Sequence, residues 1–388
     1  QDFSRLFDVD TQRAISSGLC IRCRGAKLLC GKTRCPILVR CDFMMRTAPS
    51  IDRLDLEGAS PAGVFVGRFG YPRVYVGPLV PPVHGDTTVL YTPEAWLGRP
   101  LEDIVSFRSQ LVRGMHRVDV LAVETGGRIV DLTRELALST ASTEVEVAFN
   151  RKPRGRVVLD DDVQPFGPSA PLHDLDLGTL KVDPKLDRAY SDRDLVAREA
   201  VLGLYGAQVP VSKIQRAFSV GAFGIAKQRK FVPTRWSITA VDDTIGRALR
   251  ERVKEFPLIE QIRVFESVGF DDRFLVVQFP RPWRYELIEA WYPATLWNPL
   301  GRDAVLFGDH EGLEGRTTYA SIGGCYYAAR LAVGAALVRA RRQAATALLR
   351  APHPGYIMPV GVWNVREHVR DALRRPPRYF ATLSETFR

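Results

Sequence analysis

Alternating and β-branched apolar positions predict strands at several places along the chain. Residues 64–66 and 74–76 flank the turn-rich segment 67–72, which predicts a β-hairpin with Arg68 and Arg73 beside its tip. Further strand-like runs cover residues 118–123, 145–149, 261–268, 273–279 and 285–291. The strands are therefore expected mainly around the hairpin and between residues 260 and 291.

Apolar positions recur at helical spacing in a second set of segments. These cover residues 101–115, 194–205, 211–218, 324–350 and 364–375. In the Ala-rich segment that follows Gly323, the side chains of Leu331, Ala335 and Val338 are expected to face inward. A further helix is expected in TIGRALRERV, where the preceding Asp242 or Asp243 can cap the first turn.

Five of the six cysteines fall between residues 20 and 41. A disulfide framework for the whole chain would spread them out, so the cluster predicts a local metal site. Cys20 and Cys23 are separated by two residues, and Cys30 and Cys35 supply a second pair of thiolates, which suits a structural tetrahedral zinc ion. The alternatives are free thiols or redox pairs, and Cys41 can replace Cys35 as a ligand.

Composition suggests where the chain divides. Its 388 residues can bury one large core or two to three modest ones. Between residues 151 and 192 the sequence turns to Pro, Asp, Gly and Arg with little periodicity, which indicates a connection. The expected fold is mixed α/β of the α+β type, with a zinc knuckle, then a β-rich half, then a helix-rich C-terminal half. The predicted domains are an N-terminal arm with the knuckle, a β-rich domain, a linker and an α+β domain, at residues 1–46, 47–165, 166–192 and 193–388.

The charge balance favours a polyanionic partner. There are 54 Lys and Arg against 44 Asp and Glu, for a net charge of +10. This excess does not choose between DNA, RNA, nucleotides and an anionic membrane. The apolar run at residues 331–338 is too short to cross a bilayer, and the N-terminal residues show no signal peptide. The expected location is therefore intracellular, in the cytoplasm and associated with the nucleoid.

The segment KQRKFVPTRWSITAVDD, residues 227–243, combines cations, an aromatic ring and two acids. Cations beside a planar ring suit contact with phosphates and bases. The arginines of the late helix region offer a second contact for a nucleic-acid backbone, although such a stripe is usually a solvated face. The candidate nucleic-acid-binding residues are Lys227, Arg229, Lys230, Arg235, Trp236, Arg316, Arg339 and Arg342.

Four carboxylates are candidates for metal-assisted phosphate chemistry. Asp242 and Asp243 end the basic segment, and Glu286 and Glu289 lie three residues apart in RYELIEAWY. If they converged, they could hold a divalent cation such as Mg²⁺ or Mn²⁺. The alternatives are a helix cap for the two aspartates and salt bridges for the glutamates. The six histidines form no close metal pair, and no P-loop, Rossmann pattern or nucleophile elbow occurs in the sequence.

Several long strings give the chain a resemblance to the archaeal Nre family of DNA repair proteins. These strings are the four-cysteine knuckle, FVGRFGYPRVYVGPLVPP, RKFVPTRWSITAVDD, YELIEAW, GRTTYASIGG and GVWNVRE, in order along the chain. The resemblance implies a role in repairing damaged DNA, often alongside the replication sliding clamp. Members of the family commonly end in a clamp-binding peptide with a Gln and an aromatic pair. The last ten residues here, YFATLSETFR, contain no Gln at the required place and no aromatic pair after it.

The first expectation is a DNA repair factor that binds DNA through the zinc knuckle and a basic cleft. One alternative is a metal-dependent nuclease or nucleotide-processing enzyme of DNA repair. Another is a non-enzymatic scaffold that recruits repair proteins to the sliding clamp. The sequence leaves open whether the protein is an enzyme.

Overall fold

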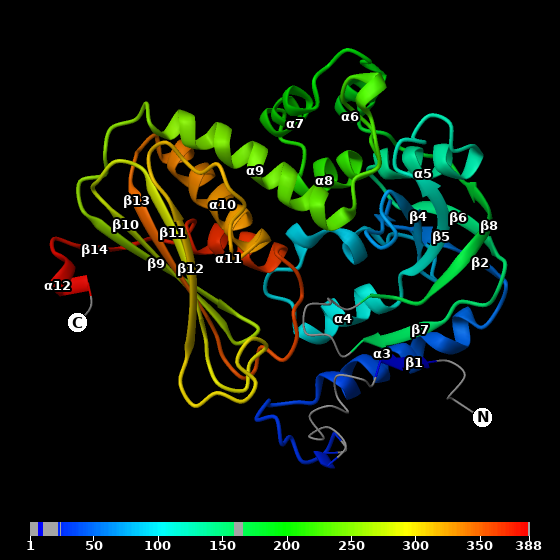
Figure 1. Ribbon diagram of the computed structural model, residues 1–388, viewed down its shortest axis with the longest axis horizontal. Helices are drawn as coiled ribbons and strands as arrows, with labels where there is room; N and C mark the ends of the chain where they lie inside the picture. Colours follow the sequence, from blue (N-terminus) through cyan, green and yellow to red (C-terminus); the bar gives the residue numbers. More distant parts are fainter. Residues whose placement is uncertain (1–6, 11–21, 24, 159–165, 387–388) are drawn as a thin grey trace. The chain divides into compact units, whose positions relative to one another are not determined.

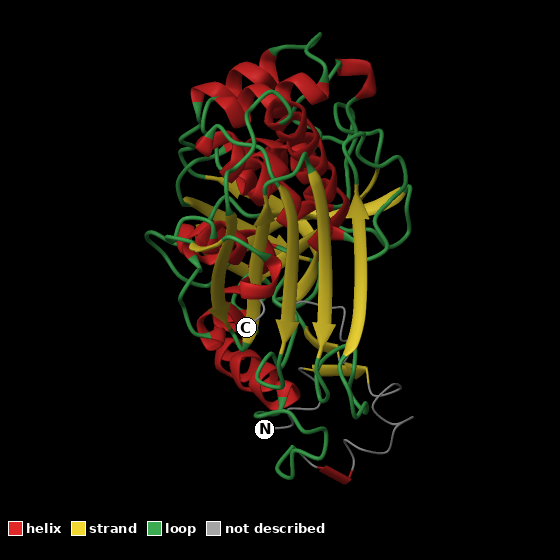
Figure 2. Ribbon diagram, turned by 90° about the vertical axis from the view of Figure 1, so that its left-hand side faces the viewer, coloured by secondary structure: helices red, strands yellow, loops and turns green. Residues whose placement is uncertain are grey.

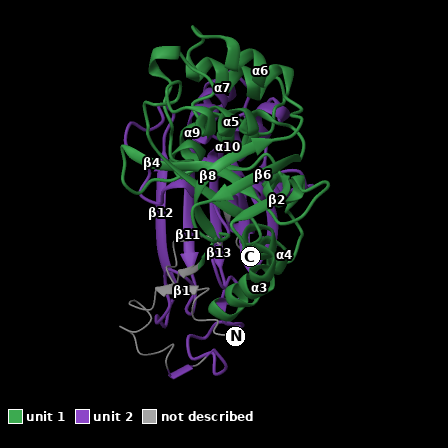
Figure 3. Ribbon diagram, turned by 90° about the vertical axis from the view of Figure 1, so that its right-hand side faces the viewer, with its two compact units in different colours: residues 1–13, 37–241 green, residues 14–36, 242–388 purple. Residues whose placement is uncertain are grey.

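The computed structural model describes residues 7–10, 22, 23, 25–158 and 166–386. It divides into unit 1, residues 1–13 and 37–241, and unit 2, residues 14–36 and 242–388 (Figure 3). The division falls inside one helix, α9 (Thr234–Val253). Residues 166–192, expected from the sequence to be a linker, contain a strand and a helix of unit 1 instead.

The main element of unit 1 is a six-stranded mixed sheet with the strand order β2-β6-β8-β5-β4-β3. The pair β5–β8 is parallel and the other neighbours are antiparallel. Along β6, buried and exposed residues alternate, as expected for a strand with one face on the core. Helix α5 packs on β4 and β8, and β1 pairs in parallel with β7.

The strands of unit 1 are β1 (Phe7–Asp10), β2 (Asp55–Ser60), β3 (Val64–Val66), β4 (Arg73–Val80), β5 (Val112–Asp119), β6 (Thr143–Phe149), β7 (Gly155–Val158) and β8 (Ser169–Leu177). Its helices are α3 (Pro36–Ile51), α4 (Leu101–Ser109), α5 (Arg128–Leu138), α6 (Pro184–Ser191), α7 (Ala197–Gly206), α8 (Val211–Ser219) and the first part of α9, with short 3₁₀ turns η2 (Thr88–Tyr91), η3 (Pro93–Ala95) and η4 (Ala226–Gln228).

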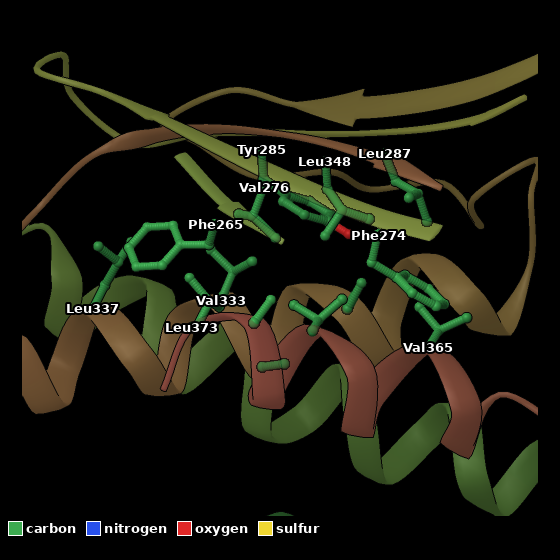
Figure 4. Close-up of a cluster of buried hydrophobic side chains, with 14 of the residues drawn as sticks. Phe265, Phe274, Val276, Tyr285, Leu287, Val333, Leu337, Leu348, Val365 and Leu373 are labelled. Carbon is green, nitrogen blue, oxygen red and sulfur yellow. The ribbon is translucent and has the colours of Figure 1, made fainter. Parts of the chain in front are cut away.

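Unit 2 is built on a second six-stranded mixed sheet, in the order β12-β11-β13-β10-β9-β14. Figure 2 looks onto this sheet and shows its strands running side by side. Helices α10 and α11 pack against each other and against the sheet (Figure 1). The core between them contains Phe274, Val276 and Leu348 from the strands and Val333 and Val365 from the helices (Figure 4).

The strands of unit 2 are β9 (Ile262–Gly269), β10 (Asp272–Phe279), β11 (Arg284–Trp291), β12 (Val305–Glu311), β13 (Ala345–Pro352) and β14 (Arg378–Phe380). Its helices are the second part of α9, α10 (Gly324–Ala340), α11 (Trp363–Ala372) and α12 (Leu383–Thr386). None of the helices in the described ranges is both long and apolar enough to cross a bilayer.

The structure confirms the mixed α/β class, the hairpin β3–β4, strands β9 to β11 and helices α7, α8 and α11. The separation into a β-rich half and a helix-rich half is not confirmed, because each unit combines a sheet with helices. The helix expected over residues 101–115 ends at Ser109, and residues 112–119 form β5.

Two predictions about helix boundaries are wrong. The late helix does not reach Arg350: α10 ends at Ala340, and Arg341 adopts a left-handed conformation with φ 52° that stops it. Arg350 instead lies buried in β13. Asp242 and Asp243 do not cap a helix, because α9 begins at Thr234, directly after Pro233.

A histidine in the core of unit 2 ties folding to pH. His368 of α11 is buried, its ring stacks on Phe274 at 5.1 Å between centroids, and its Nδ1 lies 3.1 Å from the hydroxyl of Ser267. Burial lowers the pKa of His368 to about 4, from an ordinary value of 6.5, although the nearby carboxylate of Asp371 acts in the opposite direction. Between these two pH values the unfolded chain takes up a proton that the folded protein does not. The free energy of unfolding therefore falls as the pH decreases through that window.

The substitution His368→Gln should remove this dependence. At about pH 7.5 the variant should be less stable than the parent, because it loses the stack on Phe274. At about pH 4.5 the difference in free energy of unfolding between the two proteins should be smaller by roughly 2 kcal/mol, since only the parent has lost stability through His368. Urea unfolding of both proteins at the two pH values measures this double difference. If this difference were equal at both pH values, the conclusion that His368 is buried in its neutral form would be wrong.

Candidate nucleic-acid interface

The tip of the β3–β4 hairpin and the start of α9 are joined by hydrogen bonds within unit 1. The backbone N–H of Val66 donates to the hydroxyl of Thr234 at 2.9 Å. The N–H of Val120 donates to the carbonyl of Pro72, and the N–H of Phe231 donates to the carbonyl of Val120. Residues far apart in the sequence, near 70, 120 and 231–236, therefore form one continuous surface.

Four aromatic side chains of this surface are exposed. The exposed fractions are 79% for Phe69, 46% for Tyr71, 37% for Tyr75 and 48% for Trp236. The rings of Tyr71 and Trp236 contact each other, with centroids 5.3 Å apart and planes tilted by 51°. Large aromatic side chains usually lie in a core or an interface, so this cluster is a candidate binding surface.

Arginines surround these rings. The guanidinium of Arg68 lies over the ring of Phe69 at 5.2 Å, and that of Arg117 lies over the ring of Tyr75 at 5.9 Å. Arg73 and Arg235 are exposed beside them in the sequence. Asp119 is paired with Arg73 across the sheet, but its carboxylate accepts from the backbone N–H of Leu121 instead.

We name this set the aromatic–arginine surface; it comprises Arg68, Phe69, Tyr71, Arg73, Tyr75, Arg117, Arg235 and Trp236. Within the described part of the chain, none of its four guanidinium groups makes an ion pair with a carboxylate. Exposed arginines without acids, next to exposed rings, can bind phosphates while the rings stack on bases.

The other cations of the basic segment have different surroundings. Lys227 and Lys230 are exposed and, among the residues that the structure describes, form no ion pair. Arg229 is buried, and its guanidinium donates to the carbonyls of Gly224, Tyr190 and Asp192. Burial lowers the pKa of Arg229. Its hydrogen bonds hold the segment in place, so its charge is not presented at the surface.

The three candidate arginines of unit 2 do not form a common stripe. Arg316 pairs with Asp309 at 2.7 Å and lies over the ring of Tyr326. This hydrogen bond from the Arg316 side chain to Asp309 raises the arginine pKa. Arg342 donates to the carbonyl of Arg341. Arg339 is exposed at the end of α10.

Three of the four candidate carboxylates for metal binding bind arginines inside unit 2. Asp242 is fully buried and accepts from Arg366 at 3.0 Å, and Asp243 accepts from Arg247 and Arg330. Glu289 accepts from Arg350 at 2.9 Å.

The two glutamates point to opposite sides of the sheet. Glu286 is exposed and Glu289 is buried, because residues three apart on strand β11 face opposite ways. In the described residues no group of three His, Cys, Asp or Glu side chains could hold a metal ion.

Of the candidate zinc ligands, Cys20 lies outside the described residues, while Cys23, Cys30 and Cys35 form no disulfide with a described cysteine. The pKa of Cys23 is lowered, chiefly by a hydrogen bond from the backbone N–H of Leu29 and, against the effect of desolvation, by further N–H groups of the same loop. This donor pattern suits a thiolate ligand. In contrast, burial raises the pKa of Cys325 to about 12, so that thiol stays neutral.

Sequence reasoning found Arg235 and Trp236 but missed Phe69, Tyr71, Tyr75 and Arg117. The sequence does indicate that Phe69 and Tyr71 are exposed, because they occupy a turn rich in Gly and Pro, where a side chain seldom reaches the core. Tyr75 shares the exposed face of β4 with Arg73.

This arrangement defines a mixed α/β protein whose exposed groups suit an anionic, ring-bearing ligand. Its sequence matches the family described as Archaeal Nre, N-terminal over residues 29–298 and Archaeal Nre, C-terminal over residues 311–388. The chain belongs to the archaeal Nre family.

Among its relatives, the chain is 42% identical over 370 residues to the DNA repair protein NreB of Archaeoglobus fulgidus, covering 95% of this chain and 91% of the relative. It is 34% identical over 367 residues to the DNA repair protein NreA of the same organism, with coverage of 94% and 91%. It is 36% identical over 339 residues to NreA of Haloferax volcanii, with coverage of 85% and 81%. No solved structure matches the chain.

The buried carboxylates should respond strongly to the loss of their arginine. Arg350 donates to Asp272 at 2.8 Å and to Glu289, and burial raises the pKa of Asp272 to about 6 despite this pairing. Replacing Arg350 with Met would leave two buried, uncompensated acids and should lower the free energy of unfolding by about 3–5 kcal/mol. Because low pH protonates Asp272, the loss of stability should be smaller at about pH 5 than at about pH 8.

Thermal and urea unfolding of Arg350→Met measure the loss. The exposed Arg302 provides the control, since Arg302→Met should change stability by less than about 0.5 kcal/mol. Adding Asp272→Asn and Glu289→Gln to Arg350→Met should recover part of the stability. A loss that is independent of pH and not relieved in the triple variant would show that lost packing, and not charge, is the cause.

Proposed function

We propose that this protein is a DNA repair factor that binds DNA through the aromatic–arginine surface. The repair role rests on its membership of a family whose relatives are named DNA repair proteins. The observation that carries the binding is the contact of Trp236 with Tyr71 in an exposed cluster whose guanidinium groups have no carboxylate partner among the described residues.

The chemistry of this surface favours single-stranded or locally unstacked DNA. In an intact duplex the faces of the bases are covered by their neighbours, so exposed rings find no partner there. An unpaired base can stack on Trp236, Tyr71 or Phe69, and such stacking contributes about 1–3 kcal/mol per base. The arginines then neutralise the adjoining phosphates, which adds affinity for any sequence and makes binding sensitive to salt.

The nuclease alternative has no supporting observation. Asp242, Asp243 and Glu289 already accept from arginines, and Glu286 faces away from Glu289. The proposal therefore assigns no catalytic residue. Recruitment of other repair proteins is the function that would remain if the chain bound no DNA.

The stacking role of Trp236 can be tested with Trp236→Ala. The variant should bind a single strand of about 20 nucleotides roughly 5- to 100-fold more weakly, because one stacked base loses its partner. Fluorescence anisotropy with labelled DNA measures this. Trp297→Ala is the matched control, since Trp297 is also 48% exposed but lies outside the surface.

The parent protein supplies two further checks in the same assay. If about four arginines contact phosphates, raising the salt from about 50 to about 200 mM should weaken single-strand binding roughly 50-fold. Duplex DNA of the same length should bind more weakly than the single strand. Equal affinity of the parent and Trp236→Ala, or no binding at the lower salt concentration, would refute the proposed interface.

We further propose that Cys20, Cys23, Cys30 and Cys35 hold a structural zinc ion, although the three of them that are described, Cys23, Cys30 and Cys35, are not gathered as a metal site in this structure. The chemistry of the thiols supports this, because backbone N–H groups around Cys23 lower its pKa and favour the thiolate. The loop belongs to unit 2, where the amine of Lys32 donates to the carbonyl of Ala294 at 3.3 Å. The ion would stiffen this loop.

The metal content of the purified chain tests this assignment. The parent should contain about one equivalent of zinc, and Cys23→Ser should lose most of it. Cys325→Ser is the control and should keep the metal, since Cys325 lies apart from the cluster in the core of unit 2. Zinc that is absent from the parent, or present unchanged in Cys23→Ser, would contradict the proposal.

A further inference from the structure

Unit 2 contains a cavity of about 430 Å³ that is lined by four arginines. Arg339 comes from the end of α10, Arg374 and Arg375 follow the C-cap residue of α11, and Arg263 comes from β9. The cavity adjoins one end of the core, since Phe265, Leu337 and Leu373 belong both to its lining and to the cluster drawn in Figure 4. Apolar side chains thus form its floor, and cations surround it.

The strand register explains why polar groups meet at this place. Arg263 of β9 lies opposite Tyr379 of β14 on one side and opposite Gln278 of β10 on the other. Residues that are directly paired across neighbouring strands project from the same face of the sheet. Phe265 lies two residues after Arg263 and therefore projects from the same face of β9. Because Phe265 belongs to the core, Arg263, Tyr379 and Gln278 also lie on the face of the sheet that carries the core.

The positive charge in the cavity exceeds what the fold itself needs. Arg375 pairs with Asp371 at 2.6 Å, and Arg339 makes a long hydrogen bond of 3.4 Å to the carbonyl of Leu373. The ends of α10 and α11 add about half a negative charge each. The described lining contains no Asp or Glu, so a surplus of about two positive charges remains.

A buried polar atom in the cavity also lacks a partner. The Nε of Arg263 is buried and has no hydrogen-bond partner in the described part of the chain. Gln278, which is only 2% exposed, adds an amide group to the lining. Buried polar groups are nearly always satisfied, so a donor left open in a basic cavity points to a ligand with acceptor oxygens.

We propose that this cavity binds the phosphate monoester of a nucleotide. The arginines can grip the phosphate oxygens through paired N–H donors, and Gln278 supplies a further donor. The ring of Tyr379, 57% exposed at the rim, can stack on the base, and the apolar floor covers the sugar. A volume of 430 Å³ is larger than inorganic phosphate requires and falls within the range of small-molecule pockets.

This site shares no residue with the aromatic–arginine surface, which belongs to unit 1, and the proposal does not depend on that surface. The nucleotide can be free in solution or can be the phosphorylated end of a DNA strand, because both present the same group. An internal phosphodiester offers two non-bridging oxygens and one negative charge, whereas a terminal monoester offers three such oxygens and about 1.5 to 2 negative charges at pH 7. The cavity therefore favours a terminal phosphate.

Isothermal titration calorimetry on the full chain tests the proposal with deoxyadenosine 5′-monophosphate, deoxyadenosine and inorganic phosphate. The monophosphate should bind at one site, and deoxyadenosine should bind at least about tenfold more weakly, since it lacks the charged hydrogen bonds. The double substitution of Arg339→Gln with Arg374→Gln should weaken binding of the monophosphate at least about tenfold. Tyr379→Ala should weaken binding of the monophosphate but not binding of inorganic phosphate.

Two variants serve as controls. Arg302→Gln removes an exposed arginine outside the cavity and should leave binding of the monophosphate unchanged. Trp236→Ala should also leave it unchanged, which separates this test from that of the DNA interface. Both cavity arginines are exposed, so their loss should not unfold the chain, and circular dichroism checks this.

The source of the nucleotide is decided by competition. A 5′-phosphorylated oligonucleotide and the same oligonucleotide with a 5′-hydroxyl are compared as competitors. If the phosphorylated one displaces the monophosphate better, and this advantage requires Arg374, the natural ligand is the end of a DNA strand. Displacement by the free nucleotide alone identifies a mononucleotide. Binding of the monophosphate that is unaffected by the double substitution, or no binding at millimolar concentration, overturns the proposal.

Discussion

Buried arginine–carboxylate pairs are the interaction on which unit 2 depends. Arg330 of α10 joins Glu311 of β12 to Asp243 of α9, and Arg366 of α11 binds Asp242 of α9. Arg350 of β13 joins Asp272 of β10 to Glu289 of β11. Each pair links two elements, so the sheet and its helices are held by charge as well as by apolar packing. Such pairs are costly to desolvate and specify one arrangement, because each buried charge must meet its partner.

These internal pairs also shape the surface. The chain has 54 basic against 44 acidic side chains, and several of its acids lie inside unit 2. Fewer carboxylates are then left to neutralise exposed arginines. In the aromatic–arginine surface of unit 1, no guanidinium group pairs with a carboxylate among the described residues. In the four-arginine cavity of unit 2, Arg375 pairs with Asp371, and the described lining contains no Asp or Glu. The open surface suits a strand with several bases, whereas the cavity suits a single terminal group.

Local patterns predicted a good part of the fold. The hairpin follows from Gly and Pro between two β-branched runs, and β9 to β11 follow from their alternation. The start of α9 was missed because the β-branched run at residues 237–241 does not look helical by itself. Arg350 was misplaced for a related reason: a charged residue is usually exposed, and only its two acid partners allow it to lie in a central strand.

The candidate site was predictable only in part. Trp236 and Arg235 stand out because they adjoin each other in a basic segment. Phe69, Tyr71 and Arg117 join them through backbone hydrogen bonds at Val66, Val120 and Phe231, and no sequence period records such contacts. The same holds for the row of Tyr379, Arg263 and Gln278, which depends on strand register.

The sequence by itself determined the charge excess, the cysteine cluster, the family and many of the elements, because these are properties of composition or of neighbouring residues. Only the tertiary structure decided which charges are neutralised and which remain available. Electrostatic pairing depends on distance in space, and the partners of Arg330, Arg350 and Arg366 lie tens of positions away in the chain.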